Sequence, residues 1–246
     1  MSDAGNKASP SEATTSLSRL IERAASGEEI VLTSREKRVR VSEPSQFDII
    51  LFDVGGVMLT NGWDHTERAA VLQHFNLDRA EFESRHPGPY DALERDTIDM
   101  YAYLDAAVFY QPRSFTPDGF IAVMKAQSIP IPSNAMGVLA EVAATGKWLV
   151  GLLNNESRLL HEYRMEKYGL KPYLNIQLSS CYLGMRKPDA DIYRRAIDIV
   201  GRPASRILFI DDRAGNAQAA RDAGMTAIQF LGEALLRVQL KELEIL

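Results

Sequence analysis

The chain contains, from residue 47 to residue 57, the run Phe47-Asp48-Ile49-Ile50-Leu51-Phe52-Asp53-Val54-Gly55-Gly56-Val57. Its apolar residues predict a buried strand, and a strand of a parallel sheet is covered on both faces, so no alternation is needed. Asp53 then lies at the carboxyl end of this strand, where open α/β sheets bind ligands. The glycines let backbone N–H groups approach an anion. The acid could attack phosphorus or carbon, hold a metal, or simply cap the next helix.

Composition narrows the classes of partner. The 246 residues are 46% hydrophobic, and 33 acids against 28 Lys and Arg give a net charge of -5, so nucleic acid and anionic membranes are unfavourable partners. Cys181 is the only cysteine, which makes an intrachain disulfide impossible, and we expect it to be a partly buried filler. We find no signal-peptide pattern and no apolar run of about 20 residues. We therefore expect a cytoplasmic protein.

The second half of the sequence alternates between helix and strand patterns. We predict helices over 135–145, 157–168, 188–200 and 214–223, and strands over 148–153, 176–178, 206–210 and 226–230. Repeated strand–helix units with short loops indicate an α/β fold with a doubly wound, parallel, Rossmann-like sheet. Residues 61–126 are largely helical in pattern and directly follow the first strand. They predict a small helical cap inserted into a core formed by residues 47–60 and 127–246.

Residues 1–46 predict a separate N-terminal extension. Residues 1–14 have the composition of a disordered segment, Leu17 to Ala24 have helical spacing, and 29–33 and 39–41 read as short strands. The segment from Leu17 to Pro44 resembles the central part of Phd/YefM-type antitoxins, without their opening strand. We expect an extension that packs on the main domain or hangs from it, in preference to a DNA-binding role.

Polar residues follow three of the predicted core strands. Asp53 ends the first, Asn154 and Asn155 end the second, and Asp211-Asp212 end the third; Lys187 precedes the proline expected to start a helix. Each group alone could cap a helix or be solvated. Together they would place three carboxylates at one sheet edge, where they repel one another unless a cation joins them. Hard oxygen ligands of this kind suit Mg²⁺.

These residues carry a resemblance to the haloacid dehalogenase (HAD) superfamily, in its four motifs and in their order. It is most similar to the branch with bacterial sugar-phosphate phosphatases and the phosphatase domain of soluble epoxide hydrolases. The motifs are Phe52-Asp53-Val54-Gly55-Gly56-Val57, Leu153-Asn154-Asn155, Gly184-Met185-Arg186-Lys187-Pro188-Asp189 and Phe209-Ile210-Asp211-Asp212-Arg213-Ala214-Gly215-Asn216.

The resemblance implies a Mg²⁺-dependent phosphatase of a small phosphorylated metabolite. Asp53 would be the nucleophile that forms an aspartyl-phosphate. Mg²⁺ would be held by Asp53, the backbone carbonyl of Gly55 and Asp212, with Asp211 contributing directly or through water. Lys187 would bind both Asp53 and a phosphoryl oxygen.

The resemblance also implies a phosphate-binding set. Asn154 would donate to a phosphoryl oxygen, helped by backbone N–H groups near Asn155 and at Gly56. Family phosphatases usually carry Ser or Thr at the position of Asn154, so we expect altered geometry there. Many also carry an aspartate where Gly55 stands, which protonates the leaving group and later activates water. Here a water, a cap residue or the substrate itself must act as the general acid.

Two other functions stay open at this point. A 2-haloacid dehalogenase would use Asp53 to attack carbon, but that chemistry does not call for the acidic pair Asp211-Asp212. A binding or regulatory protein with weakened catalysis is the other alternative, motivated by Gly55 and Asn154. Neither the substrate nor the oligomeric state can be read from the sequence.

Several residues at the start of the cap and near its middle could face the site. Asn61, Trp63, Asp64 and His65 follow the first motif, and His65 is expected to be a surface histidine. Glu94 to Asp96 are expected to form a solvated, charged helix end.

Overall fold

The computed structural model describes residues 7–8, 19, 23, 30–34, 37–41 and 45–246. The chain divides into two units, Met1–Gln46 and Phe47–Leu246. In the first unit β2 (Ile30–Ser34) pairs antiparallel with β3 (Lys37–Val41), which confirms the two predicted strands. β1 (Lys7–Ala8) pairs parallel with β2, so the expectation of disorder over residues 1–14 is wrong at these two residues. The helix predicted from Leu17 to Ala24 falls almost wholly outside the described residues.

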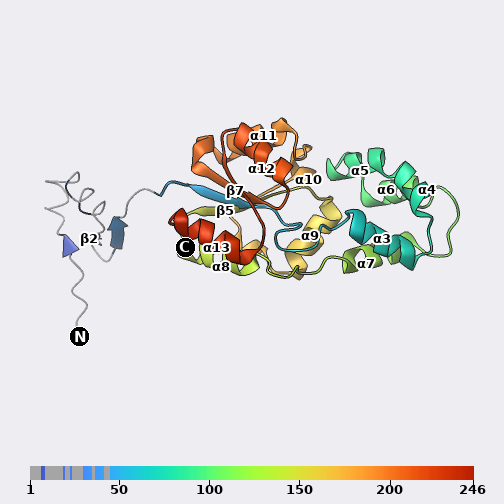
Figure 1. Ribbon diagram of the computed structural model, residues 1–246, viewed down its shortest axis with the longest axis horizontal. Helices are drawn as coiled ribbons and strands as arrows, with labels where there is room; N and C mark the ends of the chain where they lie inside the picture. The colour runs from blue at the N-terminus through green and yellow to red at the C-terminus, as the bar shows by residue number, and fades with distance from the viewer. Residues whose placement is uncertain (1–6, 9–18, 20–22, 24–29, 35–36, 42–44) are drawn as a thin grey trace. The chain divides into compact units, whose positions relative to one another are not determined.

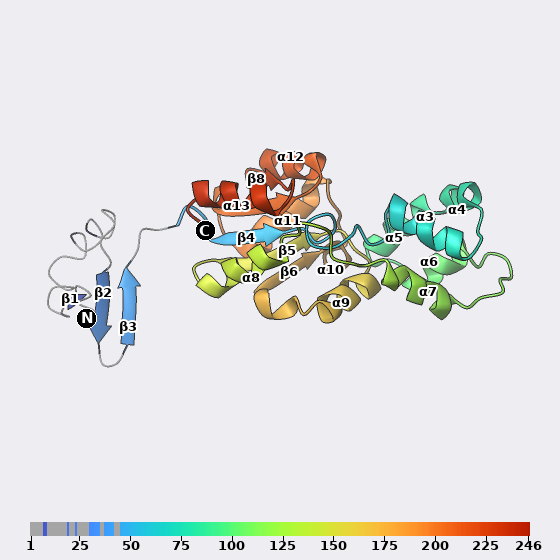
Figure 2. The same ribbon diagram turned by 60° about the horizontal axis from the view of Figure 1, so that its bottom comes forward.

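The second unit is built on a five-stranded parallel sheet with the order β6-β5-β4-β7-β8. The strands are β4 (Ile49–Phe52), β5 (Leu149–Asn154), β6 (Ile176–Ser179), β7 (Ile207–Asp211) and β8 (Thr226–Gln229). The central strand is β4, and Phe52 pairs with Leu152 and Ile210. The predicted α/β class is therefore confirmed, and the run that ends in Asp53 lies in the middle of the sheet (Figure 2).

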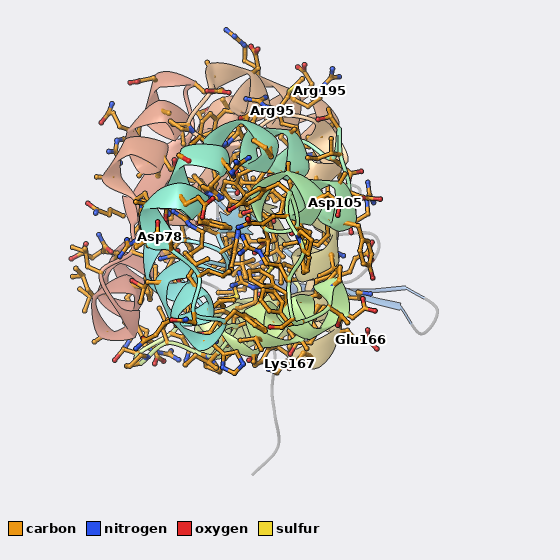
Figure 3. The ribbon with its side chains drawn as sticks, turned by 90° about the vertical axis from the view of Figure 1, so that its right-hand side faces the viewer. Asp78, Arg95, Asp105, Glu166, Lys167 and Arg195 are labelled. Atoms are coloured by element: carbon orange, nitrogen blue, oxygen red, sulfur yellow. The ribbon has the colours of Figure 1, made fainter. Side chains whose placement is uncertain are left out.

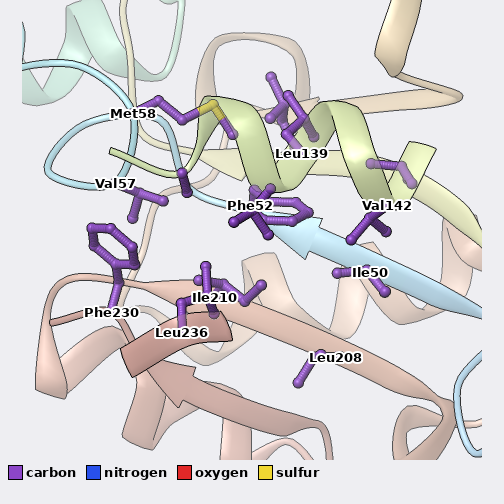
Figure 4. Close-up of a cluster of buried hydrophobic side chains, with 14 of the residues drawn as sticks. Ile50, Phe52, Val57, Met58, Leu139, Val142, Leu208, Ile210, Phe230 and Leu236 are labelled. Carbon is purple, nitrogen blue, oxygen red and sulfur yellow. The ribbon is translucent and has the colours of Figure 1, made fainter. Parts of the chain in front are cut away.

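Helices cover both faces of this sheet. In Figure 1, α11 (Ala190–Val200) and α12 (Ala214–Asp222) lie on one face, and α8 (Met136–Thr145) and α13 (Glu233–Glu242) lie on the other. Ile50 and Phe52 point to the α8 side, where they join the cluster shown in Figure 4. Ile49 and Leu51 point to the α11 side. All four strand residues are buried, which explains why the run is continuously apolar.

A group of helices between β4 and α8 has an apolar core of its own. It comprises α3 (His65–His74), α4 (Arg79–Arg85), α5 (Pro87–Glu94), α6 (Met100–Ala107) and α7 (Pro117–Ala126). Trp63, Phe82 and Phe120 are buried at its centre, and Trp63 donates to the Tyr103 hydroxyl. Side chains at N-cap positions, such as Asp99 and Thr116, accept backbone N–H groups and start these helices. We infer that α3 to α7 form the cap predicted over residues 61–126.

The remaining elements complete the core. They are α9 (Arg158–Lys167), the short helix α10 (Ser180–Leu183) and the 3₁₀ helices η1 (Lys171–Tyr173) and η2 (Ala204–Arg206). The sequence patterns did not predict α10 or α13. No helix in the described part of the chain is long and apolar enough to cross a membrane.

The helix predicted over 188–200 begins later than expected. α11 starts at Ala190, because Asp189 has extended backbone angles and serves as its N-cap residue. Pro188 therefore precedes the helix instead of occupying its first turn, and it follows a cis peptide bond with Lys187.

Candidate active site

Asp53 is the first residue after β4, and its side chain is 10% exposed. Its backbone N–H donates to the carbonyl of Ile210 at 2.8 Å, and its Oδ1 accepts the N–H of Val54 at 2.7 Å. Burial raises the pKa of Asp53 to about 8; the Lys187 ammonium acts to lower it, and Asp211 and Asp212 act to raise it. A carboxylate in this position is therefore stabilised by any additional cation.

Lys187 joins the strand ends to one another. Its Nζ lies 3.1 Å from Oδ2 of Asp53 and 2.5 Å from Oδ2 of Asp211, and its side chain is almost fully buried. The neighbouring carboxylates raise the pKa of Lys187 even though burial acts in the opposite direction, so the ammonium stays charged. The Asn155 amide fixes the backbone of Lys187: Nδ2 donates to its carbonyl and Oδ1 accepts its N–H, both at 2.8 Å.

The two acids that follow β7 have different surroundings. Asp211 is fully buried, and its oxygens accept from Lys187, from Nδ2 of Asn216 and from the N–H of Arg213. Asp212 has a buried Oδ1 with no hydrogen-bond partner among the described residues. Its carboxylate lies against Gly56, where φ is +69° and a Cβ would collide with it. Glycine is thus required at position 56 by both backbone angle and space.

The cluster fits a hard divalent cation. One oxygen each from Asp53, Asp211 and Asp212 lies within 4.8 Å of the others, and Gly55 lines the same cavity as Asp53. The orphan oxygen of Asp212 would gain a partner in a bound cation. Asp211 already has a donor at both oxygens, so its geometry suits the positioning of Lys187 more than direct ligation.

The two asparagines after β5 lie in different places. Asn155 lines the cavity beside Asp53 and Lys187. The buried Asn154 instead directs Nδ2 toward Nδ1 of His161 on α9, at 3.4 Å, and its Oδ1 has no partner in the described part of the chain. His161 in turn lies 3.0 Å from Oε1 of Gln177. The site therefore contains the predicted Asp53, Lys187, Asp211 and Asp212 together with Asn155, while Asn154 lies against α9.

The cap closes a cavity of about 80 Å³ over Asp53. Residues of the cap and its entry segment that line it are Asn61, Asp64, Tyr90 and Glu94. Glu94 is 3% exposed, burial raises its pKa, and it pairs with Arg186 at 2.8 Å. The prediction of a solvated helix end is therefore wrong for Glu94, because α5 turns this side chain inward.

A buried ion pair at the cavity was missed by sequence reasoning. Arg164 Nη1 lies 2.9 Å from Oε2 of Glu156, and both side chains are almost fully buried. Arg164 also donates to the carbonyl of Thr60 and to Oγ of Ser128, the residues next to the entry and exit of the cap. Burial raises the pKa of Glu156 to about 7 against the effect of Arg164. The signal available in the sequence was the position of Arg164, which has the helical spacing of the buried residues of α9.

Further ion pairs link the cap to the core. Arg95, labelled in Figure 3, reaches Asp189 at 2.9 Å, and Arg158 reaches Asp96 at 2.5 Å. Arg213, next in sequence to the acidic pair Asp211-Asp212, pairs with Asp64 at 2.5 Å. These pairs tie the inserted helices to the core beside the strand ends.

Two side chains lie where they were expected to lie. The side chain of His65 is 75% exposed, as predicted for a surface histidine. Cys181 is buried and free, and burial raises the pKa of its thiol to about 11, which suits a filler and not a nucleophile.

Comparisons with known proteins agree with this geometry. The family model described as haloacid dehalogenase-like hydrolase matches residues 47–224. Flavin mononucleotide hydrolase 1 of Arabidopsis thaliana is 25% identical over 206 residues, which are 83% of this chain and 81% of that protein. Bifunctional epoxide hydrolase 2 of Rattus norvegicus is 34% identical over 203 residues, covering 73% of this chain and 36% of that protein.

A solved structure shows the same fold. The HAD family enzyme BT-2542 of Bacteroides thetaiotaomicron, in complex with magnesium and inorganic phosphate, has a TM-score of 0.61 at 19% identity. The match covers 74% of this chain and 93% of that enzyme.

Proposed function

We infer the function of this chain from its family: it belongs to the haloacid dehalogenase-like hydrolases. We propose that it is a Mg²⁺-dependent phosphatase of a small phosphorylated metabolite. The observation that carries the proposal is one cluster at the centre of the sheet edge, in which Lys187 bridges Asp53 and Asp211. Beside it lies an oxygen of Asp212 that has no hydrogen-bond partner among the residues that the structure describes. The relative in Arabidopsis thaliana, a flavin mononucleotide hydrolase by name, and the phosphate-bound BT-2542 support it.

Each residue of the cluster has a part in the proposed reaction. Asp53 attacks phosphorus with one carboxylate oxygen, and the bond from phosphorus to the leaving oxygen breaks. Lys187 neutralises part of the charge on Asp53 and on a phosphoryl oxygen. Asp211 positions Lys187 by accepting from its ammonium, and Asn155 positions it by two hydrogen bonds with its backbone. Water then releases phosphate and restores Asp53.

Mg²⁺ would be held by Asp53, Asp212 and the carbonyl of Gly55, with Asp211 beside them. When bound, it offsets the repulsion between the anionic nucleophile and the anionic substrate. Phosphate contacts would come from Lys187, from Asn155 through its backbone N–H, and from Asn154 if its amide turns away from His161. The predicted contact at Gly56 finds no support, because the N–H of Gly56 already donates to the carbonyl of Leu59 at 2.7 Å.

The alternative of a 2-haloacid dehalogenase finds less support in this geometry. Three carboxylates share the site. The buried Asp212 oxygen, which no described residue contacts by a hydrogen bond, has no part in an attack on carbon. A decayed regulatory protein is also less well supported, since the nucleophile, the lysine and the acidic pair are all held in position.

The test is phosphate release from a panel of phosphomonoesters with and without Mg²⁺. We expect release that depends on Mg²⁺ and falls by more than about 10³-fold in Asp53→Asn. Asp48→Asn, which changes an acid at the opposite end of the same strand, is the matched control and should keep its activity. Undiminished release by Asp53→Asn, or chloride release from haloacids in its place, would overturn the proposal.

A further inference from the structure

Asn61 occupies the space that a side chain at residue 55 would need, where the chain has glycine. A Cβ on Gly55 would lie 2.9 Å from Oδ1 of Asn61 and 3.3 Å from its Cα, both closer than ordinary van der Waals contact. Gly55 is two residues beyond Asp53, and Asn61 lines the same cavity as Asp53 and Lys187. The Asn61 amide therefore fills the space that an acid on residue 55 would need.

The segment around Asn61 is held firmly. The N–H of Asn61 donates to Oε1 of Glu67. On one side, the N–H of Thr60 donates to the carbonyl of Ile129, and the carbonyl of Thr60 accepts from the Arg164 guanidinium. Gly62 on the other side has φ of +68° and packs directly on the Arg164–Glu156 pair. The Asn61 amide itself makes no hydrogen bond to any residue that the structure describes. The backbone of Asn61 is thus held in place, and its amide donors are available to a ligand.

We propose that Asn61 stands in for the missing leaving-group acid and contacts the leaving oxygen of the substrate. This rests on the proposed phosphatase function. An amide NH₂ can donate a hydrogen bond, but it cannot give up its proton at neutral pH. When the bond to Asp53 forms, the leaving oxygen keeps the electron pair of the broken bond and departs as an oxyanion. It takes its proton from solvent water afterwards.

The second step lacks a carboxylate base at this position as well. Water attacks the phosphorus of the aspartyl-phosphate, the bond to Asp53 breaks, and both protons of that water end on the released dihydrogen phosphate. Because the amide stabilises an oxyanion without protonating it, the enzyme selects substrates whose leaving oxygen is weakly basic. Aryl, enol and acyl phosphates belong to this class, whereas simple alkyl phosphates do not.

The test is the dependence of kcat/KM on leaving-group basicity, measured with a series of aryl phosphates and one alkyl phosphate. For the wild type we expect a steep fall as the leaving group becomes more basic. Asn61→Asp places a carboxyl in the same position, so it should flatten the series and raise the alkyl-to-aryl ratio by about 10²-fold, the lower end of what general acids contribute. Asn61→Ala should lose activity and keep the steep series.

Asn76→Asp is the matched control, since it adds the same charge at an exposed turn of the cap and should leave the series unchanged. A shallow series in the wild type, or a series in Asn61→Asp that is as steep as in the wild type, would overturn the role of Asn61 while phosphate release that depends on Asp53 still stood. The absence of any such release would instead remove the proposed function, and this inference with it.

Discussion

Asn155 shows how a single side chain can position another residue's catalytic group. Its amide makes paired hydrogen bonds with the backbone of Lys187, both at 2.8 Å. Asn155→Ala removes both bonds and leaves the lysine loop free to shift relative to Asp53. We expect kcat to fall by about 10²-fold, the effect of a displacement of about 1 Å in an active site.

The control for this prediction is the thermal stability of the variant. Thermal unfolding of Asn155→Ala should stay close to that of the wild type, because the loop is also held by the contacts of Lys187 with Asp53 and Asp211. An unchanged kcat in a folded variant would show that Asn155 does not position the lysine.

At the residue scale the sequence predicted the charged cluster well. Asp53, Asp211 and Asp212 could be placed together because parallel strands end at one sheet edge. The partnership of Asn155 with Lys187 could not be predicted, since it joins residues 32 positions apart through a loop conformation. The close approach of Asn61 to Gly55 was hidden because it depends on the conformation of the loop between them.

At the scale of elements, the base of β4 is tied to the base of β7 by one ion pair. Arg206 donates to both oxygens of Asp48, at 2.7 and 2.6 Å. The hydrogen bond from Arg206 is the main reason that the pKa of Asp48 is lowered. A lowered pKa gives stability that is present above the ordinary value and is lost as pH falls through the folded-state value.

We therefore expect Asp48→Asn to lower the free energy of unfolding by about 0.5–1 kcal/mol at pH 7, as for partly exposed pairs. The measurement is urea unfolding of both proteins at several pH values. The difference should shrink as pH falls from 3.8 toward the lowered pKa of Asp48 in the folded wild type, below which this carboxyl is also neutral. A difference that does not change with pH would assign the effect to something other than the charge.

The elements themselves could be predicted because their signals are local. The strands β4, β5, β7 and β8 are apolar runs with polar ends. The helix predicted over 135–145 ends at Thr145, where Gly146 follows in the left-handed region. The start of α11 was wrong because Pro188 favours a first-turn position in general, whereas here the extended Asp189 intervenes. The inward direction of Glu94 depends on how the cap meets the core, which no local pattern contains.

At the scale of the second unit, Phe47–Leu246, two buried histidines connect stability to pH. Burial lowers the pKa of His161 in the core and of His86 in the cap to about 4. Between pH 6.5 and 4 the unfolded chain binds more protons at these residues than the folded one, so they destabilise the fold as pH falls. Asp53 and Glu156, whose pKa values are raised, act in the opposite direction.

A comparison with His161→Gln separates the contribution of His161 to the loss of stability at low pH from that of the other groups. Relative to His161→Gln, the wild type should lose about 1–2 kcal/mol of unfolding free energy between pH 7 and pH 5. His74→Gln, at an exposed position of the cap, should show no such difference from the wild type. Parallel pH profiles for wild type and His161→Gln would mean that His161 titrates normally in the folded protein.

The central claim is that Asp53 carries the phosphoryl group during turnover. The most direct measurement is acid quenching of the enzyme during hydrolysis of a phosphomonoester with Mg²⁺, followed by borohydride reduction and peptide mass spectrometry. Borohydride reduces an acyl phosphate to an alcohol, so we predict homoserine at position 53 in the wild type. Unmodified aspartate at position 53 in an enzyme that is turning over, with the reduced residue found elsewhere in the chain or not at all, would contradict the account.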